Sequence, residues 1–137
     1  MAALTKDRNT RRRNGTSYSY PMTAAVTAFA GGIAVLDAAG NCRPGHVAAT
    51  LTAVGRFAEH ADNSAGAAAA KSVIVEPGIF RWQNSSAGDL ITKADIGALC
   101  YIVDDQTVAK TDATAARSAA GRVVDVDAQG VWVKIGI

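Results

Sequence analysis

The sequence predicts an all-β fold, a sandwich or a barrel of short strands, on three observations. Short apolar and β-branched segments are separated by turns that contain Gly, Asn or Pro at fairly regular spacing. Residues 121–137 alternate with a period of two on both sides of a break at Gln129-Gly130, which is the pattern of a β-hairpin. The helical patterns of about 10–15 residues that separate the strands of an α/β fold do not occur.

Length and composition predict one domain with a modest core. The chain has 137 residues, enough for a single hydrophobic core. Hydrophobic residues make up 49%, but alanine supplies much of that share, and only 6% of the residues are aromatic. Four large aromatic side chains are therefore the expected core anchors: Trp82, Trp132, Phe57 and Phe80.

Residues 1–16 are expected to form an extended basic arm. They show neither helical nor strand periodicity, and they end near the turn pair Asn14-Gly15. Five basic residues stand against one acidic residue, so the arm carries +4 while residues 17–137 carry −2. The basic residues are Lys6, Arg8, Arg11, Arg12 and Arg13. Such a segment is extended or disordered until a partner orders it.

Residues 17–137 are predicted to form a single β-sandwich domain. Strands are expected within residues 17–22, 33–37, 51–59, 71–84 and 99–103. Pro21 confines the first strand to a sheet edge or a strand end, because proline has no N–H to donate. Gly55 marks a bulge, and Pro77-Gly78 divides residues 71–84 into two strands.

One helical turn and one long loop are expected before the final hairpin. Thr92 can cap a helical turn, Asp95 suits its first turn, and Gly97 would end it. Residues 109–120 are small and polar and are predicted to be a loop.

The final hairpin, residues 121–137, is expected to have an aliphatic face and a polar face. Val124 and Val126 alternate with two aspartates, and the second strand continues the same alternation. The polar face would bear Asp125, Asp127, Trp132 and Lys134.

Patterns for catalysis or for metal and cofactor binding are missing. The aspartates at 104, 105, 125 and 127 lack the spacing of a Ca²⁺ loop, and His46 and His60 have no partners at ligand spacing. Neither a G-x-S-x-G elbow nor a phosphate-binding P-loop occurs. Cys42 and Cys100 lie far apart and are expected to be reduced. We therefore expect no enzyme activity, no catalytic or metal-binding residues and no cofactor.

The basic arm has two functional interpretations besides that of a solubilising tail. It could lie across an acidic protein surface and become ordered on contact. Alternatively, it could neutralise phosphates in a nucleic-acid-binding module, although the sequence has no stacking motif of the RNP type. No run approaches the roughly 18 apolar residues that a membrane span needs, so no membrane partner is expected.

Ordered strings along nearly the whole chain resemble the small capsid cement, or decoration, proteins of tailed bacteriophages. The strings are residues 1–10 (MAALTKDRNT), 19–21 (SYP), 53–55 (AVG), 78–82 (GIFRW), 98–108 (ALCYIVDDQTV), 120–127 (AGRVVDVD) and 130–133 (GVWV). They contain no catalytic motif, so the resemblance points to a family and not to a reaction.

The resemblance implies a virion protein with a jelly-roll-like β-sandwich, made in the bacterial host cytoplasm and bound to the outer surface of an HK97-type capsid. It would associate with itself, as a homodimer in preference to a trimer, and staple neighbouring subunits of the phage major capsid protein. On this view residues 1–22 can add main-chain hydrogen bonds to a partner sheet. The expected docking residues are Lys6, Arg8, Arg11, Arg12, Arg13, Tyr18 and Tyr20.

Overall fold

The structure, a computed structural model, describes residues 2–13 and 15–137, so Met1 and Asn14 of the expected arm lie outside the described residues. The predicted all-β class is confirmed, and its sheets are antiparallel apart from one short pair. Within these residues the elements are β1 (Tyr18–Pro21), β2 (Val26–Ala28), β3 (Ile33–Leu36), β4 (Cys42–Pro44), β5 (Thr52–Phe57), β6 (Ala61–Asn63), β7 (Ser72–Glu76), β8 (Gly78–Asn84), η1 (Ala87–Asp89), η2 (Lys93–Asp95), β9 (Leu99–Ile102), β10 (Thr107–Ala109), β11 (Ala119–Asp127) and β12 (Gly130–Ile135).

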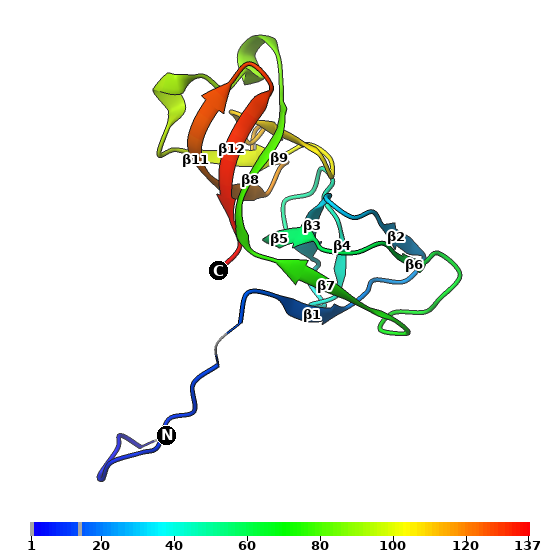
Figure 1. The fold of residues 1–137 in the computed structure, drawn as a ribbon, viewed down its shortest axis with the longest axis vertical. Coiled ribbons are helices and arrows are strands. Elements are labelled where there is room, and N and C mark those ends of the chain that lie inside the picture. The colour runs from blue at the N-terminus through cyan, green and yellow to red at the C-terminus, as the bar shows by residue number, and fades with distance from the viewer. Residues whose placement is uncertain (1, 14) are drawn as a thin grey trace.

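The strands form a closed barrel beside an open sheet, instead of the jelly-roll-like pair of stacked sheets that the resemblance implied. The barrel follows the order β10-β8-β12-β11-β9, and the sheet follows β1-β7-β5-β3-β4, with a small β2-β6 ladder alongside (Figure 1). The cause lies in β11, whose pairing register shifts once against β9 and once against β12. Such bulges bend a strand, so one half of β11 can pair with β9 and the other half with β12.

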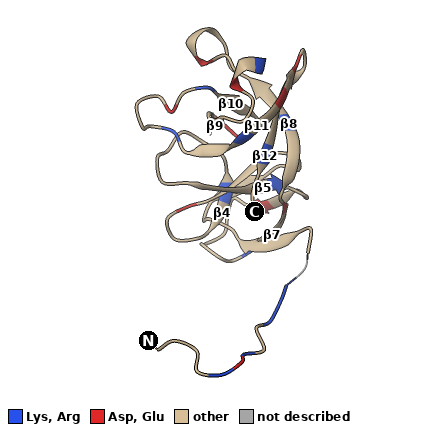
Figure 2. Cartoon of the chain, turned by 90° about the vertical axis from the view of Figure 1, so that its left-hand side faces the viewer, with Lys and Arg blue, Asp and Glu red and all other residues tan. Residues whose placement is uncertain are grey.

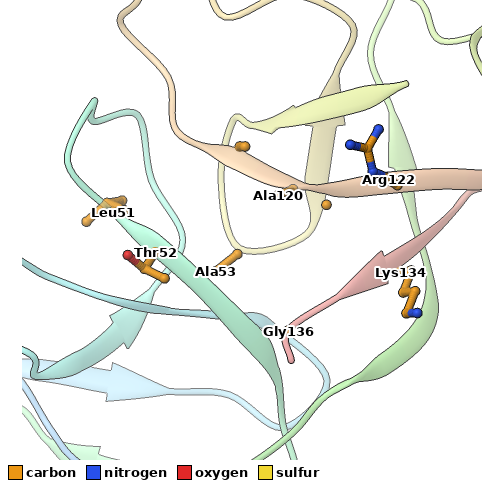
Figure 3. Close-up of a pocket in the computed structure, with 9 residues that line it drawn as sticks. Leu51, Thr52, Ala53, Ala120, Arg122, Lys134 and Gly136 are labelled. Atoms are coloured by element: carbon orange, nitrogen blue, oxygen red, sulfur yellow. The ribbon is translucent and has the colours of Figure 1, made fainter. Parts of the chain in front are cut away.

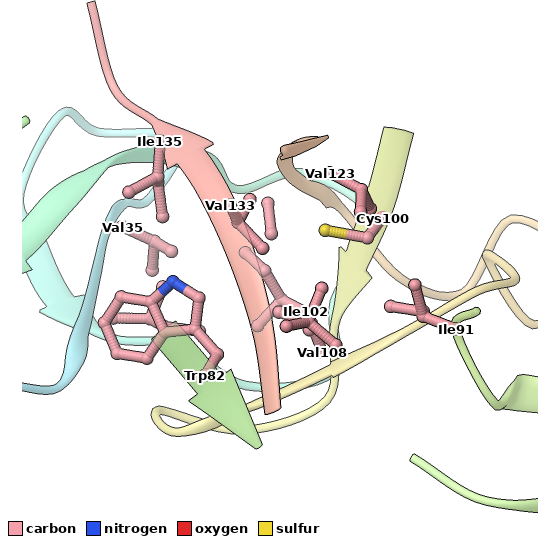
Figure 4. Packing of buried hydrophobic residues seen from close by; sticks show 12 residues of the cluster. Val35, Trp82, Ile91, Cys100, Ile102, Val108, Val123, Val133 and Ile135 are labelled. Atoms are coloured by element: carbon pink, nitrogen blue, oxygen red, sulfur yellow. The ribbon is translucent and has the colours of Figure 1, made fainter. Parts of the chain in front are cut away.

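Two hydrophobic clusters lie on opposite sides of the open sheet. The first fills the barrel and includes Trp82, Val133 and Ile135 (Figure 4). The second lies on the other side of the sheet and includes Met22 and Phe57. Strand β3 contributes to both: Ile33 and Val35 join the barrel cluster, and Ala34 joins the other. A strand buried on both faces reads as a continuous apolar run, which explains the sequence IAVL.

The aromatic residues divide between the core and the surface. Trp82 and Phe57 are 5% and 1% exposed, as predicted for core anchors. Phe80 is half-buried against the barrel cluster. Trp132 is not a core anchor: it is half-buried on the outer face of the barrel, the predicted polar face of the hairpin, where its Nε1–H donates to Asp127 at 2.8 Å. It is placed there by the alternation of β12, whose neighbouring residues point inward.

The predicted C-terminal hairpin is confirmed as β11 and β12, but one of its faces differs. Val123 pairs with Val133, and Asp125 pairs with Trp132, which leaves Val124 as an extra residue in the ladder. Val124 is therefore 40% exposed and Val123 only 3% exposed, opposite to the expected alternation. A single inserted residue shifts every following side chain to the other face.

The remaining local predictions are mostly confirmed. Thr92 and Asp95 form a reciprocal capping box around η2, with the Thr92 N–H donating to the Asp95 carboxylate at 2.8 Å. Pro21 ends an edge strand, and the register of β5 against β3 shifts next to Gly55. The predicted loop at residues 109–120 is wrong at its ends, because β10 includes Ala109 and β11 begins at Ala119. Strands β2, β4, β6 and β10 were not predicted.

Candidate interaction surface

The basic arm is the most exposed part of the chain. Residues 2–13 are all exposed and contain no helix or strand. They extend away from the body (Figure 1), and their cations form a blue band far from the mixed charges of the body (Figure 2). One backbone hydrogen bond lies within the arm, from the Thr10 N–H to the Arg8 carbonyl at 3.0 Å. The predicted docking residues Lys6, Arg8, Arg11, Arg12 and Arg13 all lie in this segment.

Five of the nine cations of the body are ion-paired, whereas no cation of the described arm is. All five ion pairs among the described residues join side chains of the body: Arg56–Glu76, Arg81–Asp127, Lys93–Asp125, Lys110–Asp95 and Arg117–Asp89. The Trp132 N–H, followed by the Gln129 N–H, lowers the pKa of Asp127, so this carboxylate stays ionised beside Arg81. The arm is therefore the concentrated source of unpaired positive charge, and such a segment attracts acidic surfaces over roughly a Debye length.

The arm leads directly into an unpaired strand edge. Strand β1 pairs with β7 in a register that sets Tyr18 opposite Val75 and Tyr20 opposite Val73. Strand β1 ends the sheet order, so no strand of the described chain covers its other edge. Alternate N–H and C=O groups on such an edge are free to pair with another extended chain.

The two tyrosines of β1 have different surroundings. Tyr18 is half-buried at the root of the arm, and the guanidinium carbon of Arg13 lies 5.8 Å from its ring centroid, within the range of a cation–π contact. Tyr20 packs against the cluster around Met22, and desolvation by burial is the largest of the effects that raise the pKa of its hydroxyl. Tyr20 thus anchors β1 to the body, while Tyr18 faces the arm. Their docking roles remain predictions.

Two of the aspartates considered as metal ligands are already hydrogen-bonded. Asp125 accepts a hydrogen bond from Lys93 at 3.4 Å, and Asp127 accepts one from Trp132. No group of three or more His, Cys, Asp or Glu side chains that could hold a metal ion occurs in residues 2–13 and 15–137. Cys42 and Cys100 are free thiols, one in each hydrophobic cluster, and burial raises the pKa of both to about 12.

Sequence reasoning missed a cleft where the barrel meets the open sheet. The cleft has a volume of about 490 Å³ and lies between β5 and β11, with Arg122 and Lys134 at one end (Figure 3). Its lining comes from three separate stretches: residues 51–53, residues 119–122, and Lys134 with Gly136. No local pattern brings these stretches together, and only the long-range pairing of the strands could have located the cleft.

No helix in the described part of the chain is long and apolar enough to cross a membrane. A scan against protein-family models, a search of curated proteins and a search of solved structures each returned no match.

Proposed function

We propose that this protein is a capsid cement protein that binds the outside of a phage head and staples neighbouring subunits of the major capsid protein. The observation that carries the proposal is the arm, with five exposed cations that lead into an open strand edge of a tightly packed body. The ordered strings that resemble cement proteins supply the identity of the partner.

The arm has the reach that a staple needs. Residues 2–17 could span about 50 Å when extended, at roughly 3.3 Å per residue. That length can cross from one subunit of a shell to its neighbour. Basic side chains would find acidic patches on the capsid surface, and the free edge of β1 would add main-chain hydrogen bonds.

Self-association would strengthen a weak contact. Two arms held in one homodimer would bind two capsid subunits, and the second binding event becomes local once the first has occurred. Such coupling raises overall affinity by roughly 10²–10⁴ without any new contact.

The proposal is tested with undecorated heads assembled from the major capsid protein of the same phage. Deletion of residues 2–16 is expected to leave the body folded and to abolish co-sedimentation with the heads. Two full-length variants then test the charge of the arm without shortening it. The triple change of Arg11, Arg12 and Arg13 to Lys should retain most binding, and the triple change to Gln should lose it. Full decoration of heads by the truncated protein would remove the arm from the proposal.

A nucleic-acid-binding module is the second candidate, because exposed cations without carboxylate partners also suit phosphates. Neutralisation of five phosphates predicts that log K falls with log[salt] with a slope of about −4.5. Titration of generic duplex DNA at low and moderate salt measures this slope. Absence of binding at low salt would eliminate this candidate.

A further inference from the structure

The cleft between β5 and β11 has the form of an empty strand position. It is lined by small side chains or none at Ala53, Ala119, Ala120 and Gly121, so the main chain of both flanking strands is accessible. Thr52 and Ala119 are exposed within it. Figure 3 shows the two strands facing each other across the opening, with the end of β12 between them.

Both flanking strands lack a neighbour on one side at this point. Strand β11 pairs with β9 from Ala119 onward, but its pairing with β12 begins only at Arg122. Strand β5 pairs with β3 along most of its length, but with β7 only at Arg56 and Phe57. Alternate residues of a strand direct their N–H and C=O groups to opposite sides, so each stretch has main-chain groups that no described strand pairs.

The end of β12 leaves β11 and passes to β5 at the edge of the cleft. Gly136 has φ +83°, a conformation that favours glycine, and a side chain there would collide with the Val54 carbonyl oxygen. The chain therefore leaves the β11 ladder after Lys134, and no described strand continues that ladder along Ala119–Gly121.

The charge at the cleft is unusual for this body. Arg122 and Lys134 are directly opposite each other in the β11–β12 register, and like charges at such positions repel. The Arg122 guanidinium donates to the Gly97 carbonyl at 2.8 Å, but neither cation has a carboxylate partner among the described residues. Every other cation of the barrel strands and turns between residues 78 and 137 is ion-paired.

We propose that this cleft binds an extended acidic segment of a partner protein, which lies alongside β11 and pairs with its main chain. The segment would occupy the position that β12 vacates, and its carboxylates would neutralise Arg122 and Lys134. The basic arm of a second copy is repelled by the same two cations. The site is separate from the arm and from the free edge of β1, so it does not depend on the proposed capsid function.

The test is an NMR titration of the full chain, labelled with ¹⁵N, with three synthetic hexapeptides that alternate Val with Asp, Ser or Lys. The Val-Asp peptide is expected to shift the amides of residues 52–54 and 119–122, and the Val-Lys peptide is expected to leave them unchanged. Arg122→Gln and Lys134→Gln should each weaken binding about two- to five-fold, the range for single exposed ion pairs. Lys93→Gln is the matched control, because Lys93 pairs with Asp125 away from the cleft, and it should not change the affinity.

Ala53→Trp would fill the opening and is expected to abolish the shifts, with a thermal melt to verify that the variant is folded. Three results would overturn the proposal: no shifts at millimolar Val-Asp peptide, shifts confined to the arm, or equal binding of the Val-Asp and Val-Lys peptides. Inorganic phosphate is titrated in parallel. If phosphate alone reproduces the shifts with the same affinity, the cleft is a simple anion site and the proposal fails.

Discussion

The barrel and the open sheet differ in their strand edges. The barrel order closes on itself, so each of its five strands pairs with two others, although β11 pairs with β9 through one half and with β12 through the other. The sheet ends at β1 and β4, and the basic arm joins it at β1. Closure removes edges that could recruit another chain, whereas an open edge next to a charged arm is suited to recruitment. The comparison assigns rigidity to the closed barrel and the proposed binding of the arm to the open edge of the sheet at β1.

The largest expected effect is on stability, and it tests whether the packed core of the barrel contributes more to stability than the barrel's outer face does. Trp82 fills the barrel core, whereas Trp132 is half-buried on the outer face of the adjacent strand. Trp82→Ala should lower the free energy of unfolding by about 3–5 kcal/mol, because it leaves a large cavity. Trp132→Ala should cost about 1 kcal/mol, through the lost bond to Asp127 and partial exposure. Urea denaturation measures both, and equal losses would contradict the division between core and surface.

The next effect concerns the junction of the two halves. Gly55 has φ +148°, and a Cβ at this position would collide with the Glu76 carbonyl oxygen just before the chain passes from β7 to β8. Gly55→Ala should therefore lower the free energy of unfolding by about 2–3 kcal/mol. Gly40→Ala is the matched control. It also has a positive φ, +81°, but its Cβ would meet nothing within 4 Å. In urea denaturation, the midpoint concentration of Gly40→Ala should be clearly higher than that of Gly55→Ala.

A smaller effect appears in acid. Hydrogen bonds from Ser64, by its hydroxyl and then its N–H, and from Thr27 lower the pKa of Asp62 from 3.8 to about 2. A carboxylate whose pKa is depressed in the folded state stabilises the protein at pH values above its pKa in the unfolded chain. This stabilisation is lost as the pH falls through the pKa of the folded state. The melting temperature should thus fall between about pH 4 and pH 2, less steeply in Asp62→Asn.

Asp7→Asn is the control for that experiment. Asp7 is exposed in the arm, outside the folded body, so its substitution should leave the acid profile unchanged. A profile that flattens equally in both variants would show that general charge, and not the turn around Asp62, governs acid stability.

The sequence predicts those parts of the structure that depend on near neighbours. The capping box of Thr92 and Asp95 and the C-terminal hairpin have all their determinants within a few residues. The exposed Val124 could not be predicted, because the bulge shows only in the pairing of β11 with its partner strands, which lie far from it in the sequence or across the turn. Strands β2, β4, β6 and β10 have three residues each, too few for an alternation to show.

The two candidate surfaces differ in the same way: one depends on a single segment, and the other depends on long-range pairing. The arm is visible in the sequence as five cations in 13 residues, because its property is composition. The cleft at Arg122 and Lys134 is invisible there, because it requires the register that sets these cations opposite each other and the divergence of β5 from the barrel. Sequence therefore reveals surfaces made of one segment, and pairing reveals surfaces made of several.

The smallest expected effect on stability completes the comparison between body and arm. Removal of residues 2–12 leaves Arg13 over the ring of Tyr18 and takes away only exposed side chains. The free energy of unfolding should therefore change by less than about 0.5 kcal/mol, and the urea m-value should stay the same, since no buried surface is lost. Arg13→Ala should cost at most about 1 kcal/mol, the value of an exposed cation–π contact. If the truncation instead lowers stability by more than Arg13→Ala does, the arm packs on the body in solution. A docking arm would then first have to detach, and its affinity for a capsid would be reduced by the fraction of molecules in which it is bound to its own chain.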